Sequence, residues 1–281
     1  MPLKFKLDRH SLETMYKSIV FPVMEYAIQV WGGTYDSDIN KLEQIHVDGM
    51  RLVTGATARS NIANLYNETA WQPFSDRRND QMLVMFYKIK NNFVPDYLTE
   101  LLPPENHENI NYNLRNNHNI TLPYSRLESF RRSFVPYSIN LWNRLKIEVR
   151  LSPSISEFKK ALKSDCKETC VWYYYGKRWA SVHHARIRLG CSKLRADLYY
   201  RHHVIDNPNC SCGYAIEDAE HFFFNCPNYN DLRTNFIEKV SAFALPTKNT
   251  ILYGDKNLLL KHNQAILDAT HEFITLSKRF D

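Results

Sequence analysis

The sequence predicts a mainly α-helical fold in three consecutive regions: a helical bundle, a mixed linker region and a small C-terminal helical domain. Apolar residues recur every three or four positions over long stretches, which is the spacing of one buried helix face. Glycine or proline stands at the ends of several of these stretches. Of the 281 residues, 44% are hydrophobic and 23% are charged, as in a globular protein that can bury a core.

The first helix is expected over residues 12–30 and ends at Gly32 and Gly33. Pro22 falls inside its apolar pattern and must kink the helix or mark a restart. We expect one face of this helix to be buried. The residues of that face are Leu12, Met15, Tyr16, Ile19, Val20, Val23, Tyr26, Ala27 and Val30.

Further helices follow with short connections, and together with the first they form a bundle over residues 1–102. They are expected at about 38–53, 61–68, 75–90 and 95–101. The second region, 103–170, opens with an Asn-rich extended or looped segment to residue 123 and returns to helix at about 133–145 and after Pro153. In the third region, 171–281, we expect a long amphipathic helix at 178–203, or a helix pair broken near Gly190, and helices at about 229–242 and 258–278.

A metal-binding pattern lies in the third region. Cys210, Cys212, His221 and Cys226 form the motif C-x-C-G-x8-H-x4-C. Three thiolates and one imidazole within 17 residues suit tetrahedral zinc, and Gly213 gives the backbone freedom that a tight reversal after Cys212 needs. Because four protein ligands leave no open position, we expect a structural Zn²⁺ and not a catalytic one.

An alternative for this motif is a set of buried free thiols beside a histidine with ordinary hydrogen bonds. The spacing C-x-C is one residue tighter than the commoner C-x2-C. Two further cysteines, Cys166 and Cys170, are interpreted as thiols of a helix, and Cys191 as a packing thiol.

Basic and aromatic residues alternate between positions 172 and 203. Seven Lys and Arg residues stand there against Asp197 alone, so this stretch carries a charge of +6, equal to the net charge of the whole chain. Cations neutralise phosphates and aromatic faces stack on unpaired bases, so the pattern indicates binding of RNA or DNA. The alternative is a solvated amphipathic helix whose aromatic residues face inward. The candidate residues are Lys177, Arg178, Arg186, Arg188, Lys193, Arg195 and Arg201, with a second cluster at Arg126, Arg131 and Arg132.

Catalytic motifs are not found in the sequence. A nucleic-acid polymerase needs paired aspartates that hold two metal ions, and no Asp-Asp dipeptide occurs. There is no phosphate-binding glycine-rich loop and no G-x-S-x-G motif. We therefore name no catalytic residue. We also expect no secretory signal and no membrane span, which places the chain in the nucleus or cytoplasm.

Several segments together resemble the C-terminal thumb and zinc-knuckle region of LINE-type (non-LTR) retrotransposon reverse transcriptases. Their order and spacing are more specific than any one of them. The segments are YKSIVFPVMEYAIQVW at 16–31, KLEQIH at 41–46, RLVTG at 51–55, YNLRN at 112–116, SFVPYSINLWNRL at 133–145, FKKAL at 158–162, RIRLG at 186–190, CSCG at 210–213, EH at 220–221 and CPNY at 226–229.

This resemblance implies a parent RNA-directed DNA polymerase whose thumb holds the template–primer duplex and whose knuckle contacts RNA or target DNA. The chain departs from the family at Gly190-Cys191, where members often have Gly-His, and the catalytic fingers and palm are absent from the sequence. The leading expectation is thus a zinc-dependent nucleic-acid-binding fragment of such an element. The alternatives are a host-retained protein-interaction or RNA-binding module without enzymatic role, and a decayed fragment without a cellular role.

Overall fold

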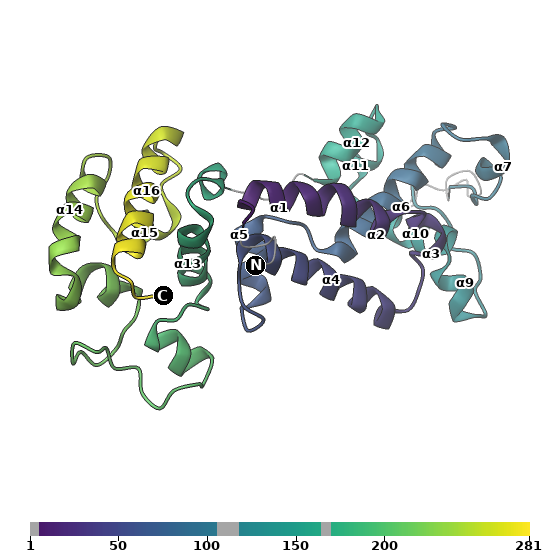
Figure 1. Ribbon diagram of the computed structural model, residues 1–281. Coiled ribbons are helices and arrows are strands. Elements are labelled where there is room, and N and C mark those ends of the chain that lie inside the picture. Colours follow the sequence, from purple (N-terminus) through teal and green to yellow (C-terminus); the bar gives the residue numbers. More distant parts are fainter. Residues whose placement is uncertain (1–5, 106–117, 164–169) are drawn as a thin grey trace. The chain divides into compact units, whose positions relative to one another are not determined.

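The computed structural model describes residues 6–105, 118–163 and 170–281 (Figure 1). These residues are mainly helical and contain no β-strand, only one isolated antiparallel bridge between Glu105 and Ile120. The expected mainly α-helical fold is therefore confirmed. The chain forms two compact units from interleaved segments: unit 1 is Met1–Ser18, Val47–Trp71 and Glu168–Asp281, and unit 2 is Ile19–His46 and Gln72–Lys167.

The first apolar stretch is four short helical pieces and not one helix. They are α1 (Arg9–Met15), the π-helical turn η2 (Tyr16–Val20), α2 (Phe21–Glu25) and α3 (Ile28–Trp31). Asp8 caps α1 by accepting a hydrogen bond from the backbone N–H of Ser11. Pro22 lies in the first turn of α2, where its missing N–H costs no hydrogen bond, so the expected restart at this proline is observed.

The expected buried face of this stretch is correct at its start and wrong further along. Leu12 and Tyr16 are buried, but the side chains of Val23 and Val30 are 76% and 86% exposed. A π-helical turn adds a residue to the turn, and Ala27 has a φ of +51°, so the spacing of three and four loses its phase after residue 16. The residues buried beyond that point are Phe21, Met24 and Ile28.

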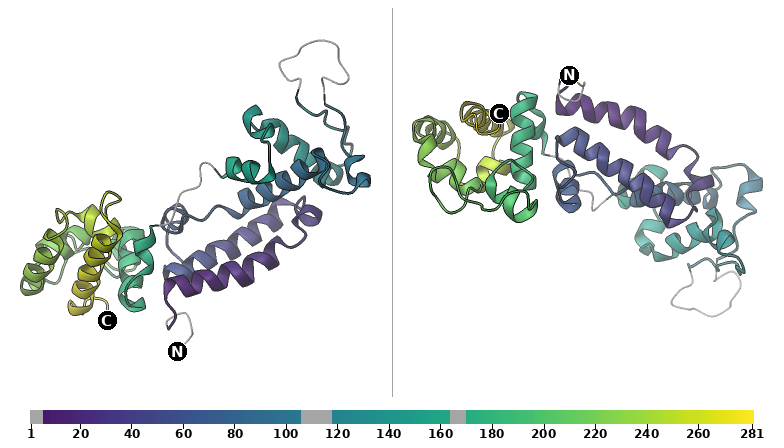
Figure 2. Two further views of the ribbon diagram at one scale, coloured as in Figure 1. Left: turned by 90° about the horizontal axis from the view of Figure 1, so that it is seen from above. Right: turned by 60° about the horizontal axis from the view of Figure 1, so that its bottom comes forward.

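Unit 1 has its core among aromatic residues of the C-terminal segment. In Figures 1 and 2, α16 (Leu260–Leu276) lies between α13 (Arg178–Leu189) and α14 (Asn230–Ser241), and it contacts both. Phe222, Phe223, Phe236 and Phe273 pack against one another there. Besides α1, unit 1 contains the shorter elements α5 (Ile62–Thr69), η3 (Val171–Tyr174), η4 (Asp197–Arg201), η5 (His221–Asn225), η6 (Pro227–Tyr229) and α15 (Lys248–Tyr253).

For residues 178–203 the sequence allowed either one long helix or a helix pair broken near Gly190, and the structure has the break at Gly190. Gly190 ends α13 with a φ of +64°, and a side chain there would collide with the guanidinium of Arg201.

Unit 2 is built around α6 (Phe74–Lys90). The helices α10 (Phe134–Arg144) and α12 (Ile155–Leu162) pack on it, and Phe86, Trp142 and Phe158 fill the space between them. The shorter helices of this unit are α7 (Asp96–Thr99), α9 (Glu128–Arg132) and α11 (Ile147–Arg150).

The helix α4 (Asp36–Thr54) contributes residues to both units, since the boundary between them falls after His46. This grouping by contacts does not follow the three regions expected from composition, which remain a prediction. The extended segment expected at 110–114, and Cys166, lie outside the described residues.

Candidate metal centre and nucleic-acid interface

Cys210 and Cys212 lie in a tight loop. The backbone N–H of Cys210 donates to the carbonyl of Tyr214 at 2.8 Å, and that of Gly213 donates to the carbonyl of Cys210 at 3.0 Å. Gly213 has a φ of +93°, and a Cβ placed on it would meet no atom within 4 Å. The glycine is therefore required by the backbone angle alone, as the sequence predicts.

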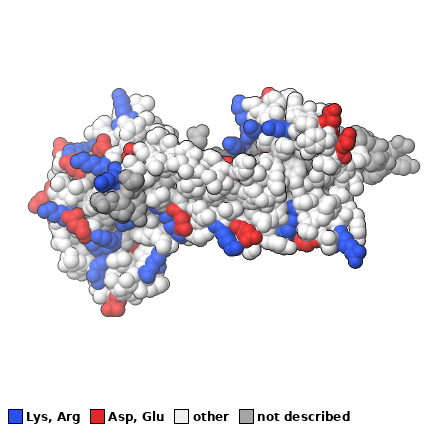
Figure 3. All heavy atoms as spheres, turned by 45° about the vertical axis from the view of Figure 1, so that its right-hand side comes forward, with Lys and Arg blue, Asp and Glu red and all other residues white. Residues whose placement is uncertain are grey.

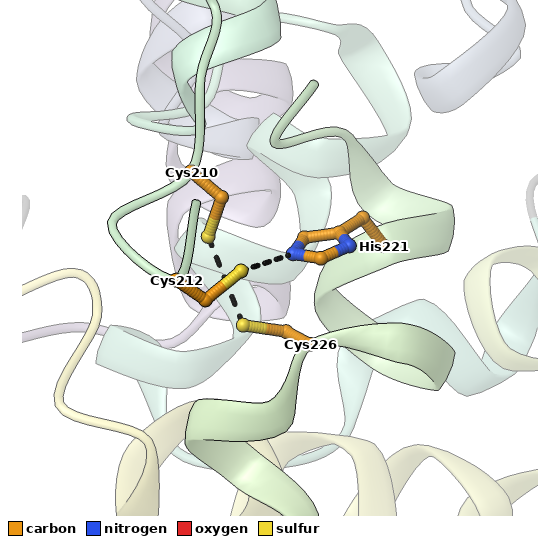
Figure 4. A group of neighbouring side chains, drawn as sticks. All are labelled: Cys210, Cys212, His221 and Cys226. Atoms are coloured by element: carbon orange, nitrogen blue, oxygen red, sulfur yellow. Dashed lines mark hydrogen bonds between the residues drawn. The ribbon is translucent and has the colours of Figure 1, made fainter. Parts of the chain in front are cut away.

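His221 and Cys226 lie at the two ends of the π-helical turn η5. The side chain of Asp218 accepts a hydrogen bond of 2.8 Å from the backbone N–H of His221 and so caps the turn. The N–H of Cys226 donates to the carbonyl of His221 at 2.7 Å, five residues back, which is the π-helical spacing. This turn brings the two side chains to the same side, toward the cysteine loop (Figure 4).

The four side chains point toward one another from the loop and the turn (Figure 4). Cys210 Sγ and Cys226 Sγ are 3.7 Å apart, Cys212 Sγ and His221 Nε2 are 3.3 Å apart, and all four ligand atoms lie within 4.8 Å of one another. Tetrahedral zinc with Zn–S of about 2.3 Å and Zn–N of about 2.0 Å places its ligand atoms about 3.5–3.8 Å apart. The cluster therefore has the dimensions of a site that can hold a metal ion such as Zn²⁺.

The protonation of the ligands in the metal-free state follows from their surroundings. The backbone N–H of Tyr214 lowers the pKa of Cys212, whereas burial raises the pKa of Cys226 to about 12. Burial lowers the pKa of His221, which favours the neutral ring whose Nε2 can act as a ligand. A divalent cation would displace the thiol protons, because only thiolates bind it.

Interactions outside the cluster hold the loop in place. The carboxylate of Glu217, almost fully buried, receives two hydrogen bonds from Arg279 at 2.5 and 2.6 Å and one from the backbone N–H of Arg195 at 3.0 Å. Arg233 donates to the carbonyls of Phe223 and Cys226. The two halves of the motif are thus fixed to the rest of unit 1 by charged side chains as well as by packing.

Two of the predicted nucleic-acid ligands, Arg178 and Arg186, bind backbone oxygens near the end of α4. Arg178 donates to the carbonyls of Val53 and Leu52 at 2.6 and 2.9 Å, and Arg186 donates to the carbonyl of Gly55 at 2.8 Å. These carbonyls are at or just beyond the C-terminus of α4, where a cation also offsets the helix dipole.

Arg188 is buried inside unit 1. It forms a two-point ion pair with Glu68, and its guanidinium lies over the ring of Tyr173 at 4.1 Å. Glu68 also receives a hydrogen bond from the buried Arg9 at 2.7 Å. The guanidinium of Arg188 is thus engaged by partners inside the protein.

The other candidates of this stretch are exposed or half-buried. Lys177 and Arg201 are exposed, and Arg201 lies 3.8 Å from Asp197. Lys193 donates to the carbonyls of Phe280 and Asp281 at 2.7 and 3.0 Å, and Arg195 to the carbonyl and the side-chain oxygen of Asn207.

In unit 2, Arg131 and Arg132 pair with Glu128, and Arg132 also pairs with Asp36; Arg126 is exposed. Most of the face shown in Figure 3 is neither basic nor acidic, and the Lys and Arg residues on it stand among Asp and Glu. Several of the basic residues predicted from the sequence are therefore engaged by backbone oxygens or carboxylates of the protein itself.

A pocket of about 590 Å³ beside the metal motif was not expected from the sequence. Tyr200, Arg201, Lys248 and Tyr253 line it together with apolar residues and with Ile216 and Asp218 of the motif loop. Lys248 and Tyr253 lie on α15, more than 20 residues beyond Cys226, so no local spacing could connect them to the motif.

No protein-family model, no curated protein and no solved structure matches this chain. None of the helices in the described part of the chain is both long enough and apolar enough to cross a bilayer.

Proposed function

We propose that the chain is a zinc-dependent nucleic-acid-binding region of the kind found at the C-terminus of non-LTR retrotransposon reverse transcriptases, with RNA or DNA as its partner. No catalytic step is assigned to it. The observation that carries the proposal is the pocket beside the candidate metal centre. Its exposed cations and aromatic residues are the groups that bind an unpaired nucleotide.

The composition of the pocket fits one nucleotide of a single strand. Tyr200 and Tyr253 are each about half exposed and offer ring faces for stacking on a base. Arg201 and Lys248 offer positive charge to the phosphate. The carboxylates of Asp197 and Asp218 also line the pocket, and Asp197 lies 3.8 Å from Arg201. Ile187 and Leu252 provide an apolar floor.

The proposed role of the metal is structural. Ile216 and Asp218 line the pocket and lie between the ligands Cys212 and His221. A bound Zn²⁺ would hold this segment at both ends and so keep one wall of the pocket in place, because four protein ligands leave no position for a substrate.

Binding of labelled single-stranded RNA and DNA, measured by fluorescence anisotropy at two salt concentrations, tests the proposal. We expect binding that weakens steeply with salt. Tyr200→Ala should weaken binding about 5- to 150-fold, as expected for the loss of about 1–3 kcal/mol of stacking. Tyr97→Ala, at an exposed tyrosine of unit 2, is the matched control and should leave binding unchanged. Absence of binding at low salt, or an equal effect of both variants, would contradict the proposal.

A second candidate function, a protein-interaction module, is supported by a different observation. Ile19, Val23, Tyr26 and Val30 of unit 2 are all more than half exposed. Exposed apolar side chains are typical of protein-binding sites where they form a contiguous patch. The variants Val23→Lys and Val30→Lys test this function. If they abolish a protein complex that resists nuclease but leave nucleic-acid binding unchanged, these residues belong to a protein-binding surface.

A further inference from the structure

We propose that a groove of unit 2 between α6 and α12 is a second nucleic-acid site, which binds the sugar–phosphate backbone and not the bases. The groove has a volume of about 390 Å³ and lies within unit 2, away from the cysteine motif in the sequence. That its ligand is a nucleic acid rests on the proposed function; its preference for a polyanion rests on its own residues.

One face of α6 forms the length of the groove. Arg77, Gln81, Val84 and Lys88 line it at intervals of three or four residues, so they share one side of the helix. The distance along the helix axis from the first to the last is about 16 Å at about 1.5 Å per residue. The groove is therefore long enough for more than one phosphate of a strand, since successive phosphates of a duplex strand advance by about 3.4 Å.

Three lysines supply free positive charge. Lys88 lies in the last turn of α6, and Lys159 and Lys163 lie in and directly after the last turn of α12. Among the described residues, none of the three has an ion-pair partner within 4.0 Å. Arg77, by contrast, is engaged by Glu25 at 2.7 Å.

The negative charge near these lysines is smaller. Among the described residues, Asp80 is the one carboxylate that lines the groove; it accepts a hydrogen bond of 2.8 Å from Gln72, and burial raises its pKa. Each helix C-terminus adds a partial charge of about −0.5. The three ammonium groups outnumber Asp80 and the two helix ends together, so the groove favours an anion.

The remaining lining residues indicate which part of a nucleic acid it contacts. Gln29, Gln72 and Gln81 add side-chain amides, which can donate to phosphate oxygens. No Phe, Tyr, Trp or His is found among the described residues that line the groove, so these residues offer no ring for stacking on a base. Lysine ammonium groups and amides without aromatic residues bind the backbone and are insensitive to base sequence.

Salt-dependent binding of the full chain to a duplex and to a single strand tests this site. The double variant Lys159→Gln/Lys163→Gln is compared with Lys146→Gln/Lys160→Gln, which removes two exposed lysines of the same unit that do not line the groove. Each lost phosphate contact should reduce the slope of log K against log salt by about 0.9, and the affinity at about 0.1 M salt about eightfold. The control pair should keep the wild-type slope, and Lys88→Gln should act like the groove variants.

Several outcomes would overturn the proposal. Equal slopes for the groove and control pairs, with both variants folded by thermal unfolding, would exclude backbone contacts at this groove. Displacement of the nucleic acid by inorganic phosphate, beyond the effect of chloride at equal ionic strength, would indicate a site for the free anion. Loss of binding in Tyr200→Ala with unchanged groove variants would leave the proposed function intact and reject the groove. If instead the groove variants weaken binding and Tyr200→Ala does not, the pocket beside the metal centre is rejected and the groove is retained.

Discussion

The guanidinium of Arg188 and the carboxylate of Glu68 form a buried two-point ion pair, with Nε–Oε2 at 3.0 Å and Nη2–Oε1 at 2.7 Å. The two residues are 120 positions apart in the chain. Arg9 donates to the same carboxylate and to the backbone carbonyl of Glu68. One carboxylate thus pairs with two buried cations that come from different segments of unit 1.

Glu68→Gln should strongly destabilise the protein, because it leaves two buried guanidinium groups without a counter-charge. We expect a loss of about 3–5 kcal/mol in the free energy of unfolding, measured by urea denaturation with circular dichroism. Glu272→Gln, which breaks an exposed ion pair with Lys239, is the control and should cost less than about 1 kcal/mol. Similar losses in the two variants would show that the buried triad contributes no more than a surface pair.

Stability should also fall as the pH is lowered below the ordinary pKa of histidine. His184 Nδ1 lies 3.2 Å from His271 Nε2 in the core; burial lowers the pKa of His184 well below 6.5 and that of His271 to about 4. The unfolded chain binds protons at these residues from about pH 6.5 downward, whereas the folded chain does not. Their contribution is therefore complete above pH 6.5 and is lost as the pH falls toward 4.

Urea midpoints measured at several pH values between neutrality and the acid range check this expectation. His271→Gln should reduce the slope of the unfolding free energy against pH, and His203→Asn, at an exposed histidine, should not. The Arg pair lowers the pKa of Glu68 below its ordinary 4.5, so the loss from that carboxylate occurs at a lower pH than the start of the histidine effect. A flat profile from neutrality down to pH 5 would contradict the histidine effect.

The candidate metal centre should bind one equivalent of zinc per chain. Cys226→Ser removes one of the four ligands and should abolish stoichiometric zinc in elemental analysis and lower the melting temperature. Cys170→Ser changes a free thiol outside the cluster and should keep the wild-type metal content. Cobalt substitution gives a second measurement, since tetrahedral thiolate coordination has a characteristic absorption. Equal zinc in the two variants would reject the site.

Gly213 and Gly176 allow the cost of a backbone angle to be separated from the cost of a collision. Both have a φ of +93°, but a Cβ on Gly213 meets nothing within 4 Å, whereas one on Gly176 lies 2.3 Å from Nδ1 of the buried His271. Gly213→Ala should cost about 1–2 kcal/mol, the strain of the left-handed region. Gly176→Ala should cost clearly more in the same unfolding assay, and equal costs would mean that the His271 ring moves away freely.

Lys177 and Arg178 are neighbours with opposite expected roles. Arg178→Ala removes hydrogen bonds from a charged group to the carbonyls of Leu52 and Val53 and should lower stability by about 1.5–3 kcal/mol. Lys177 is exposed, and its substitution by Ala should change stability by less than about 0.5 kcal/mol. Because the sequence predicts that Lys177 binds nucleic acid, Lys177→Ala should weaken that binding; unchanged binding would contradict this prediction.

The sequence was informative where one helix face determines the structure. The ends of α4, α6 and α16 lie within two residues of those predicted, because their apolar spacing continues without interruption. The same reasoning failed after Tyr16, because a π-helical turn and the left-handed Ala27 cannot be recognised from the spacing of apolar residues. Short helices such as α9 and α11 contain too few residues to show a period.

The candidate site was likewise only partly predictable from the sequence. Its four possible metal ligands were predictable because they lie within 17 residues and share one local turn and loop. The role of Arg188 was not, because its partner Glu68 is 120 residues away. The groove lysines of α6 and α12 likewise come together only through the packing of distant helices, which a single sequence does not reveal.

The interleaving of the two units has a consequence for how this protein is made. A ribosome releases the segments containing Arg9 and Glu68 well before Arg188, and at roughly 5–20 residues per second the intervening 120 residues take about 6–24 seconds. During that interval the early part of unit 1 lacks the helix that completes its ion triad. Unit 2, whose segments end at Lys167, is synthesised in full before that helix emerges. Vectorial synthesis therefore favours an order in which unit 2 folds first and unit 1 closes last.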